Sequence, residues 1–148
     1  MPLHAIPRHA SNSLISLRLT QGKRQESEFG VELGRTGSKR AGTGLLWAYE
    51  AEAEELPQVG DIEIVVDHNY EPVLVTRVTT VEVVPFNEVT AGYAAIEGEG
   101  DGSLDYWREG HWNFLSRECA RIGREPRDDM AVVCSVFELL ASVPRSAA

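Results

Sequence analysis

A lysine set among glycines is the first feature of the sequence that could do chemistry. Residues 37–46 read GSKRAGTGLL, with Lys39 and Arg40 among three glycines and an apolar run behind them. A glycine-rich loop with two cations can meet an anion through its backbone N–H groups. It is not a P-loop, because position 33 holds Leu instead of Gly and because Arg40 follows the lysine. Lys39 is therefore either a functional amine or a solvated surface charge.

Three carboxylates gather in a second short stretch. Residues 97–101 read EGEGD, which brings Glu97, Glu99 and Asp101 close together before a helix start. Neighbouring carboxylates can raise one another's pKa and do acid–base work, and they can hold a hard divalent cation such as Mg²⁺ or Mn²⁺. The alternative is structural: Asp101 caps the helix, and the glutamates favour its positive end.

Other residue types with chemical potential give weaker signals. His111 falls on the apolar stripe of an expected helix, which is typical of a satisfied, half-buried histidine. The sequence contains no H-x-x-x-H or C-x-x-C pattern, so a structural zinc site is not expected. Aromatic side chains could stack on nucleic-acid bases, although most sit beside leucines at helix or strand spacing and are more simply core residues. These aromatic residues are Trp47, Tyr49, Tyr106, Trp107 and Trp112.

Composition limits the class of protein. The chain has 148 residues, which favours one domain, and a formal net charge of −9. Residues 1–45 carry seven basic and three acidic side chains, whereas residues 46–148 carry seven and 20. This excess of negative charge disfavours non-specific binding of duplex DNA, which needs many phosphate contacts. It still allows a small basic pocket that takes one strand or one nucleoside. Two cysteines and no long apolar run predict a reduced, cytoplasmic protein without a membrane span.

The elements that would position these residues follow from periodicity. Alternation predicts strands at 62–66 and 72–85, the second long or bent, and an apolar strand at 130–140. A short helix is expected within 85–98. Leu104, Trp107, His111, Leu115, Cys119 and Ile122 form one helical stripe, which predicts a helix that Ser103 or Asp101 caps and Gly123 ends.

The stretch that follows the lysine loop fits either a strand or a short helix, and a short strand is possible near 14–19. Strands outnumber helices, and the helices cluster rather than alternate with strands. The sequence therefore predicts an α+β fold, a small, partly closed barrel with two or three helices packed outside.

Three stretches together resemble a bacterial ASCH-domain protein of the PUA-like superfamily. They are KRAGTGLLWAYEAEAEELPQVGD, PVLVTRVTTVEVVPFNEV and EGEGDGSLDYWREGHWNFLSREC with the later VVCSVFELL. The likeness spans about residues 37–140. It implies a domain at 31–142, with a poorly patterned segment at 1–30 and a frayed tail at 143–148. It also implies a cleft at the barrel mouth that binds RNA or a nucleoside, and relatives that act as ribonucleases or as amidohydrolases on N4-acetylcytidine.

The family signature, G-x-K-x-x-E-x-R with Thr at the Glu position in the nearer subgroup, maps onto this chain only in part. Gly37 and Lys39 match its opening, Gly42 falls where the Thr or Glu stands, and Gly44 falls where the Arg stands. Thr43 comes one residue late. The resemblance implies a lysine, a threonine and a glutamate in the amidohydrolases, with Glu97 or Glu99 as the glutamate. Ser103 matches a recurrent serine of the subgroup.

These considerations define the candidate site. The candidate catalytic residues are Lys39, Glu97, Glu99 and Ser103. The candidate ligand-binding residues are Arg40, Thr43, Trp47, Asp101 and Tyr106, and no residue is assigned as a metal ligand.

Three functions remain open. One is a module that binds single-stranded RNA or a modified nucleoside, with a metal-assisted ribonuclease that uses Mg²⁺ or Mn²⁺ as its catalytic version. Another is an amidohydrolase, ranked lower because glycine at position 42 offers no hydroxyl group to the acyl group. The third is a degenerate domain that makes only protein contacts. Neither membrane nor duplex DNA is an expected partner.

Overall fold

The structure, a computed structural model, describes residues 17–21, 40–67 and 69–144. One five-stranded sheet runs through it in the order β1-β3-β4-β5-β2. Its strands are β1 (Leu17–Gln21), β2 (Ala41–Leu45), β3 (Ile62–Val66), β4 (Pro72–Pro85) and β5 (Ala131–Ser142). Within the described residues three α-helices accompany the sheet: α2 (Leu46–Ala51), α3 (Ala91–Glu97) and α4 (Leu104–Arg121), with a 3₁₀ turn, η1, at Phe86–Glu88.

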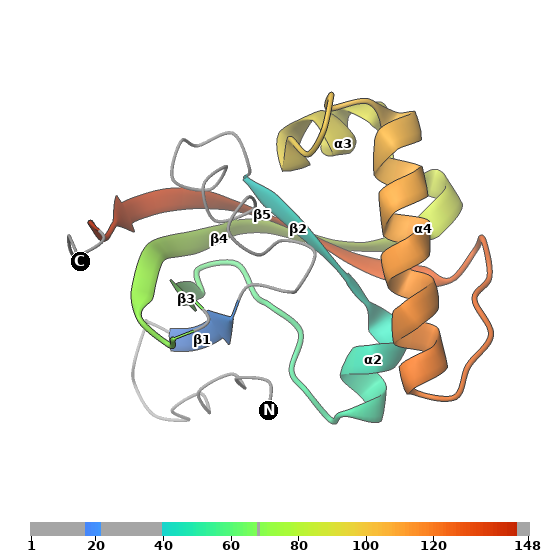
Figure 1. The fold of residues 1–148 in the computed structure, drawn as a ribbon, viewed down its shortest axis with the longest axis horizontal. Helices are drawn as coiled ribbons and strands as arrows, with labels where there is room; N and C mark the ends of the chain where they lie inside the picture. Colours follow the sequence, from blue (N-terminus) through green and yellow to red (C-terminus); the bar gives the residue numbers. More distant parts are fainter. Residues whose placement is uncertain (1–16, 22–39, 68, 145–148) are drawn as a thin grey trace.

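Four of the strands form a curled antiparallel half-barrel, in the order β3, β4, β5 and β2, and β1 adds to the edge of β3 in parallel. The 14-residue β4 pairs with β3 and with β5. Its register with β5 shifts between Val75 and Thr76 and again between Val78 and Thr80. Such bulges increase the local twist, so one long strand can follow the curve of the sheet. Figure 1 shows β4 bending through this curve, with the helices gathered at one end of the sheet.

The main core lies between the helices and the adjoining parts of the sheet. α4 contributes Trp107, Phe114, Leu115 and Cys119 to it, and β5 contributes Val132 and Cys134. The stripe on α4 is the one that the sequence predicts, and Ser103 caps the helix by accepting a hydrogen bond from the backbone N–H of Tyr106. The predicted α+β fold with helices beside a partly closed barrel is confirmed.

Most predicted elements are found, with two refinements. The stretch after the lysine loop contains both alternatives, because β2 ends at Leu45 and α2 begins at Leu46. The helical spacing from Phe86 through Val89 to Tyr93 does not belong to one helix. Val89 and Thr90 have extended backbone, so η1 ends at Glu88, and α3 begins at Ala91 as a separate helix that Thr90 caps.

Strand β2 starts beside the end of α3. The backbone N–H of Arg40 donates to the carbonyl of Ile96 over 3.2 Å, and the carbonyl of Arg40 accepts from the N–H of Phe137. The residue that precedes β2 is thus held between α3 and β5. This placement determines which side chains of β2 meet Glu97, the last residue of α3.

Candidate functional site

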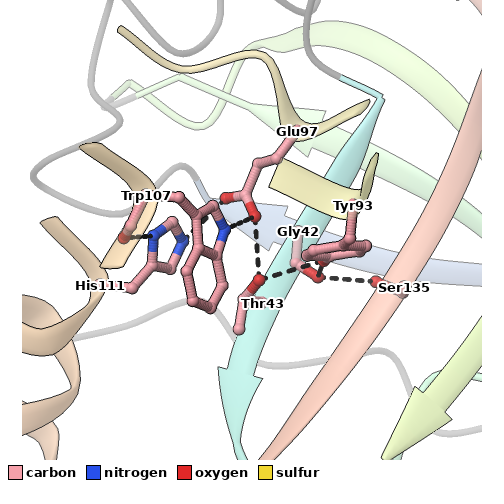
Figure 2. Close-up of polar contacts among 7 residues, drawn as sticks. All are labelled: Gly42, Thr43, Tyr93, Glu97, Trp107, His111 and Ser135. Atoms are coloured by element: carbon pink, nitrogen blue, oxygen red, sulfur yellow. Dashed lines mark hydrogen bonds and ion pairs between the residues drawn. The ribbon is translucent and has the colours of Figure 1, made fainter. Parts of the chain in front are cut away.

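A buried carboxylate lies at the centre of the candidate site. Glu97 is only 1% exposed. Its Oε1 accepts hydrogen bonds from Thr43 Oγ1 and from Trp107 Nε1, each over 2.9 Å, and its Oε2 lies 2.9 Å from His111 Nε2 (Figure 2). An ionised carboxylate in such a place would cost several kcal/mol without partners. Glu97 has donors on both oxygens, so its position and orientation are fixed.

His111 is held at both ring nitrogens. Nδ1 lies 2.9 Å from the carbonyl of Trp107, which can only accept, so Nδ1 carries a proton. Burial alone lowers the pKa of His111, but the hydrogen bond to Glu97 and the Glu97 charge outweigh it and leave the pKa raised. The ring also stacks on the indole of Trp107, with centroids 4.1 Å apart. This arrangement favours an imidazolium paired with the Glu97 carboxylate.

A hydroxyl chain extends from Glu97 to the backbone of β2. Thr43 Oγ1 lies 3.0 Å from the phenolic oxygen of Tyr93, which donates to the carbonyl of Gly42 over 2.7 Å. Ser135 also donates to that carbonyl, over a longer 3.4 Å. Burial, with the nearby charge of Glu97, raises the pKa of Tyr93 far above its usual range, so its phenol keeps its proton.

Local sequence explains how these side chains meet. Thr90 caps α3 by accepting from the N–H of Tyr93, and Gly98 ends the helix with a φ of 72°. Tyr93 and Glu97 are four residues apart within this helix, so they lie one turn apart on the same face. Because alternate residues of a strand face opposite ways, Thr43 and not Gly42 presents its side chain to Glu97. We call Thr43, Tyr93, Glu97, Trp107 and His111 the Glu97 cluster.

Glu99 lies near the cluster and raises the question of a metal. One ligand atom each from Glu97, Glu99 and His111 falls within 4.8 Å of the others. The Nδ1–H bond to a carbonyl is one that metal-binding histidines commonly make, so Nε2 is the nitrogen that could ligate, and it can do so only when His111 is neutral. The raised pKa of His111 instead favours the protonated ring. The three residues as arranged therefore fit an ion pair better than a Mg²⁺ or Mn²⁺ site.

The remaining residues of the acidic loop have local roles. Asp101 is exposed and accepts from the backbone N–H of Ser103, and hydrogen bonds from Ser103 lower its pKa. Ser103 is the helix cap described above. Tyr106 is 51% exposed, and its ring covers Gly100 so closely that a Cβ there would lie 2.3 Å from it.

Three other candidate residues lie outside the Glu97 cluster or outside the described residues. Trp47 is on α2, where the guanidinium of Arg124 sits 4.4 Å from its ring centre, and it packs against the main core. It makes no contact that places it in the Glu97 cluster. Arg40 is exposed at the start of β2. Lys39, together with the segments 1–16 and 22–38, lies outside the described residues, and so does the end of the tail at 145–148.

The sequence pointed to Thr43 and Glu97, and the structure joins them. It did not point to Tyr93, nor to His111 and Trp107 as partners of Glu97. The i, i+4 spacing of Trp107 and His111 puts both on one face of α4. Their pairing with a carboxylate ten or more residues earlier depends on the turn at Gly98, which no periodicity encodes.

Comparisons with known proteins agree with this architecture. The family model described as the ASCH domain matches residues 20–141. An ASCH domain from Lactobacillus crispatus JV V101 is 35% identical, with a TM-score of 0.76 over 84% of this chain and 79% of that one. A protein of the DUF984 family from Enterococcus faecalis V583 is 34% identical, with a TM-score of 0.72 over 80% and 71% of the two chains.

A search of curated proteins gave no match. None of the helices in the described part of the chain is long and apolar enough to cross a membrane.

Proposed function

The chain belongs to the ASCH domain family, and on this premise we propose that it binds a nucleoside, free or at the end of a single-stranded RNA, beside the Glu97 cluster. One observation carries the proposal: Thr43 of β2, three residues after Arg40, donates its hydroxyl proton to the buried Glu97. Buried charges are weak sources of stability, and groups of this kind concentrate at functional sites. The cluster thus supports a binding role more than a purely structural one.

The rim around the cluster offers the contacts that a nucleotide needs. Arg40 is exposed, and its backbone is bonded to Ile96 at the end of α3, so its guanidinium is available to a phosphate near the acidic loop. Tyr106 presents a half-exposed aromatic ring in the first turn of α4, directly after that loop. Base stacking on an aromatic ring contributes about 1–3 kcal/mol per base. In this proposal Lys39 meets the phosphate or an exocyclic carbonyl of the base.

The proposal is tested by binding. Fluorescence anisotropy measures affinity for a labelled single-stranded RNA, and calorimetry measures affinity for cytidine and N4-acetylcytidine. Arg40→Ala weakens RNA binding and its salt dependence, because one phosphate contact is lost. Tyr106→Ala weakens binding at all salt concentrations. Arg77→Ala is the matched control, since Arg77 is exposed and pairs with Glu138 on β5. Equal losses in the control, or no binding by the unaltered protein, would favour a domain that makes only protein contacts.

A second candidate function is an amidohydrolase that acts on an acylated nucleoside such as N4-acetylcytidine. The hydrogen bond between Thr43 and Glu97 favours it, because a hydroxyl beside the carboxylate compensates for the glycine at position 42. In this version Lys39 activates water, or attacks the acyl carbon and is then released by water. Glu97 carries the proton, and Thr43 holds the Glu97 carboxylate in place. The products are the free amine and acetate.

Release of acetate from N4-acetylcytidine tests the second candidate. Lys39→Ala, Thr43→Val and Glu97→Gln abolish turnover, and Thr43→Ser retains most of it because the hydroxyl remains. Cleavage of RNA that needs Mn²⁺ and stops with a chelator would instead support the ribonuclease. The raised pKa of His111, which favours the protonated ring, argues against that outcome. Binding without turnover leaves the binding module as the function.

A further inference from the structure

Three oxygen–oxygen contacts link Glu97 to the carbonyl of Gly42, but the two hydroxyl groups between them supply only two protons. Thr43 has one hydroxyl proton and Tyr93 has one, yet the chain comprises three contacts: Glu97 to Thr43, Thr43 to Tyr93, and Tyr93 to the carbonyl of Gly42. The carbonyl can only accept, so the proton of Tyr93 is committed to it. The single proton of Thr43 can serve Glu97 or Tyr93, but not both.

The Oε1 oxygen of Glu97 can carry the missing proton. If Glu97 gains a proton on Oε1, it donates to Thr43, Thr43 turns its own proton to Tyr93, and all three contacts are filled. Trp107 also contacts Oε1, but an indole N–H only donates and cannot receive a proton. Oε2 already faces His111. The ionised and protonated forms of Glu97 thus differ only by the rotation of one hydroxyl group.

We propose that Tyr93 is a positioning residue for the Thr43 hydroxyl, and that the two hydroxyls let Glu97 take up and release a proton while every heavy atom stays in place. The inference deepens the amidohydrolase candidate and rests on it for its use: Glu97 would take the proton of the attacking water as its O–H bond breaks and return it to the departing amine. Without such a chain, each change of charge would leave a buried oxygen unpaired.

Other titratable groups face Glu97 and stay constant in this scheme. His111 on α4 keeps its protonated pairing, and Glu99 lies on the loop that follows α3. The Cys134 thiol on β5 also hydrogen-bonds to Tyr93, and burial raises its pKa to about 12. The thiol therefore remains neutral and donates to the Tyr93 oxygen, which leaves the proton of Tyr93 on the carbonyl of Gly42. Only the hydroxyl proton of Thr43 changes its acceptor.

The two hydroxyls make opposite predictions. Tyr93→Phe removes the acceptor that Thr43 needs when Glu97 is protonated, so it disfavours the protonated form. Thr43→Val removes a donor to the carboxylate, and hydrogen bonds to charged groups are the stronger ones, so it disfavours the ionised form. The midpoint of the Glu97 titration therefore moves to lower pH in Tyr93→Phe and to higher pH in Thr43→Val. Each shift is about 0.5 to 1 pH unit, the equivalent of one hydrogen bond.

The experiment is a titration of the free protein labelled with ¹³C at glutamate carboxyls, with the Glu97 signal identified by its loss in Glu97→Gln. Thr43→Ser restores the unaltered midpoint, and Ser135→Ala, which removes a hydroxyl outside the Thr43–Tyr93 contact, does not move it. At one acidic pH where all proteins are folded, the protonated fraction of Glu97 is highest in Thr43→Val, intermediate in the unaltered protein and lowest in Tyr93→Phe.

Shifts in the same direction, or no shift in Tyr93→Phe, would overturn the inference, and a fall in melting temperature alone would assign Tyr93 a structural role. No substrate is present in the titration. Opposite shifts in a protein that does not hydrolyse N4-acetylcytidine would sink the amidohydrolase but keep the hydroxyl chain. Hydrolysis of N4-acetylcytidine without opposite shifts would support the amidohydrolase but rule out the hydroxyl chain.

Discussion

His111 Nε2 and Glu97 Oε2 lie 2.9 Å apart, with both side chains less than 10% exposed. The pair joins the end of α3 to the second turn of α4 across a glycine-rich loop. Two ionised groups in so dry a place attract strongly, and each would be costly to bury alone. The contact therefore fixes the angle between the two helices and the orientation of the carboxylate at once.

The stability that this pair provides depends on pH. The folded-state pKa of His111 is raised, so the contribution is fully present below the unfolded value, about 6.5, and is lost as the pH rises through the folded value. We expect the unfolding free energy of the protein to fall relative to that of His111→Gln as pH increases above about 6.5. Urea unfolding of both proteins from pH 5.5 to pH 9 measures the difference. A constant difference across this range would show that His111 has the same pKa in the folded and unfolded protein, and a difference that grows in favour of the unaltered protein as pH rises would show that His111 is neutral in the fold.

Removal of both partners of the His111–Glu97 pair costs less than the sum of the two single removals. Glu97→Gln leaves an imidazolium without its counter-charge, and His111→Gln leaves a buried carboxylate with one partner fewer. Breaking a buried ion pair in this way typically costs about 3–5 kcal/mol. The double variant relieves part of each penalty, so the two single losses do not add. A double-mutant cycle from chemical denaturation measures this coupling, and strict additivity would contradict the ion pair.

The sequence predicts the helices and strands around the site better than the side-chain contacts within it. Apolar alternation located β3, β4 and β5, and the stripe from Trp107 to Cys119 located α4, because those residues fill the core. Thr43 and Glu97 were singled out by family resemblance and by residue type. Their contact spans 54 positions and depends on the curl of the sheet, which no local pattern records.

Tyr93 and His111 show what was hidden. Nothing in the sequence singled out Tyr93 as a site residue, whereas His111 was expected to be a satisfied, half-buried histidine on an apolar stripe. The structure buries His111, and the partners that satisfy both residues are the candidate site residues themselves. A buried polar residue needs a hydrogen-bond partner, but only the three-dimensional structure shows which residue that partner is.

Ser103 gives a test between a catalytic role and a capping role. Its hydroxyl oxygen accepts from the N–H of Tyr106 at the start of α4. Loss of such a cap costs about 1 kcal/mol, so Ser103→Ala lowers stability by about that amount. Ser103→Asp restores it, because aspartate is an equally good cap and favours the positive helix end. Thermal unfolding measures all three proteins. Failure of Ser103→Asp to recover stability would mean that the serine does something other than cap.

Two glycines of β2 make the most direct test of how the strand is packed. Neither Gly42 nor Gly44 has a positive φ, so each backbone accepts an L-residue. A Cβ on Gly42 would meet only Phe137, at 4.0 Å, whereas a Cβ on Gly44 would lie 2.8 Å from the ring of Tyr49. Gly42→Ala should therefore stabilise the protein by about 0.5–1 kcal/mol through lower chain entropy in the unfolded state.

Gly44→Ala should destabilise the protein by about 1–3 kcal/mol, because the Tyr49 ring must move out of its place. Equilibrium unfolding in urea compares the two variants directly, and each serves as the control for the other, since the strand and the substitution are the same. Equal stability of the two would mean that Tyr49 yields freely. In that case the glycine at position 44 would owe nothing to packing.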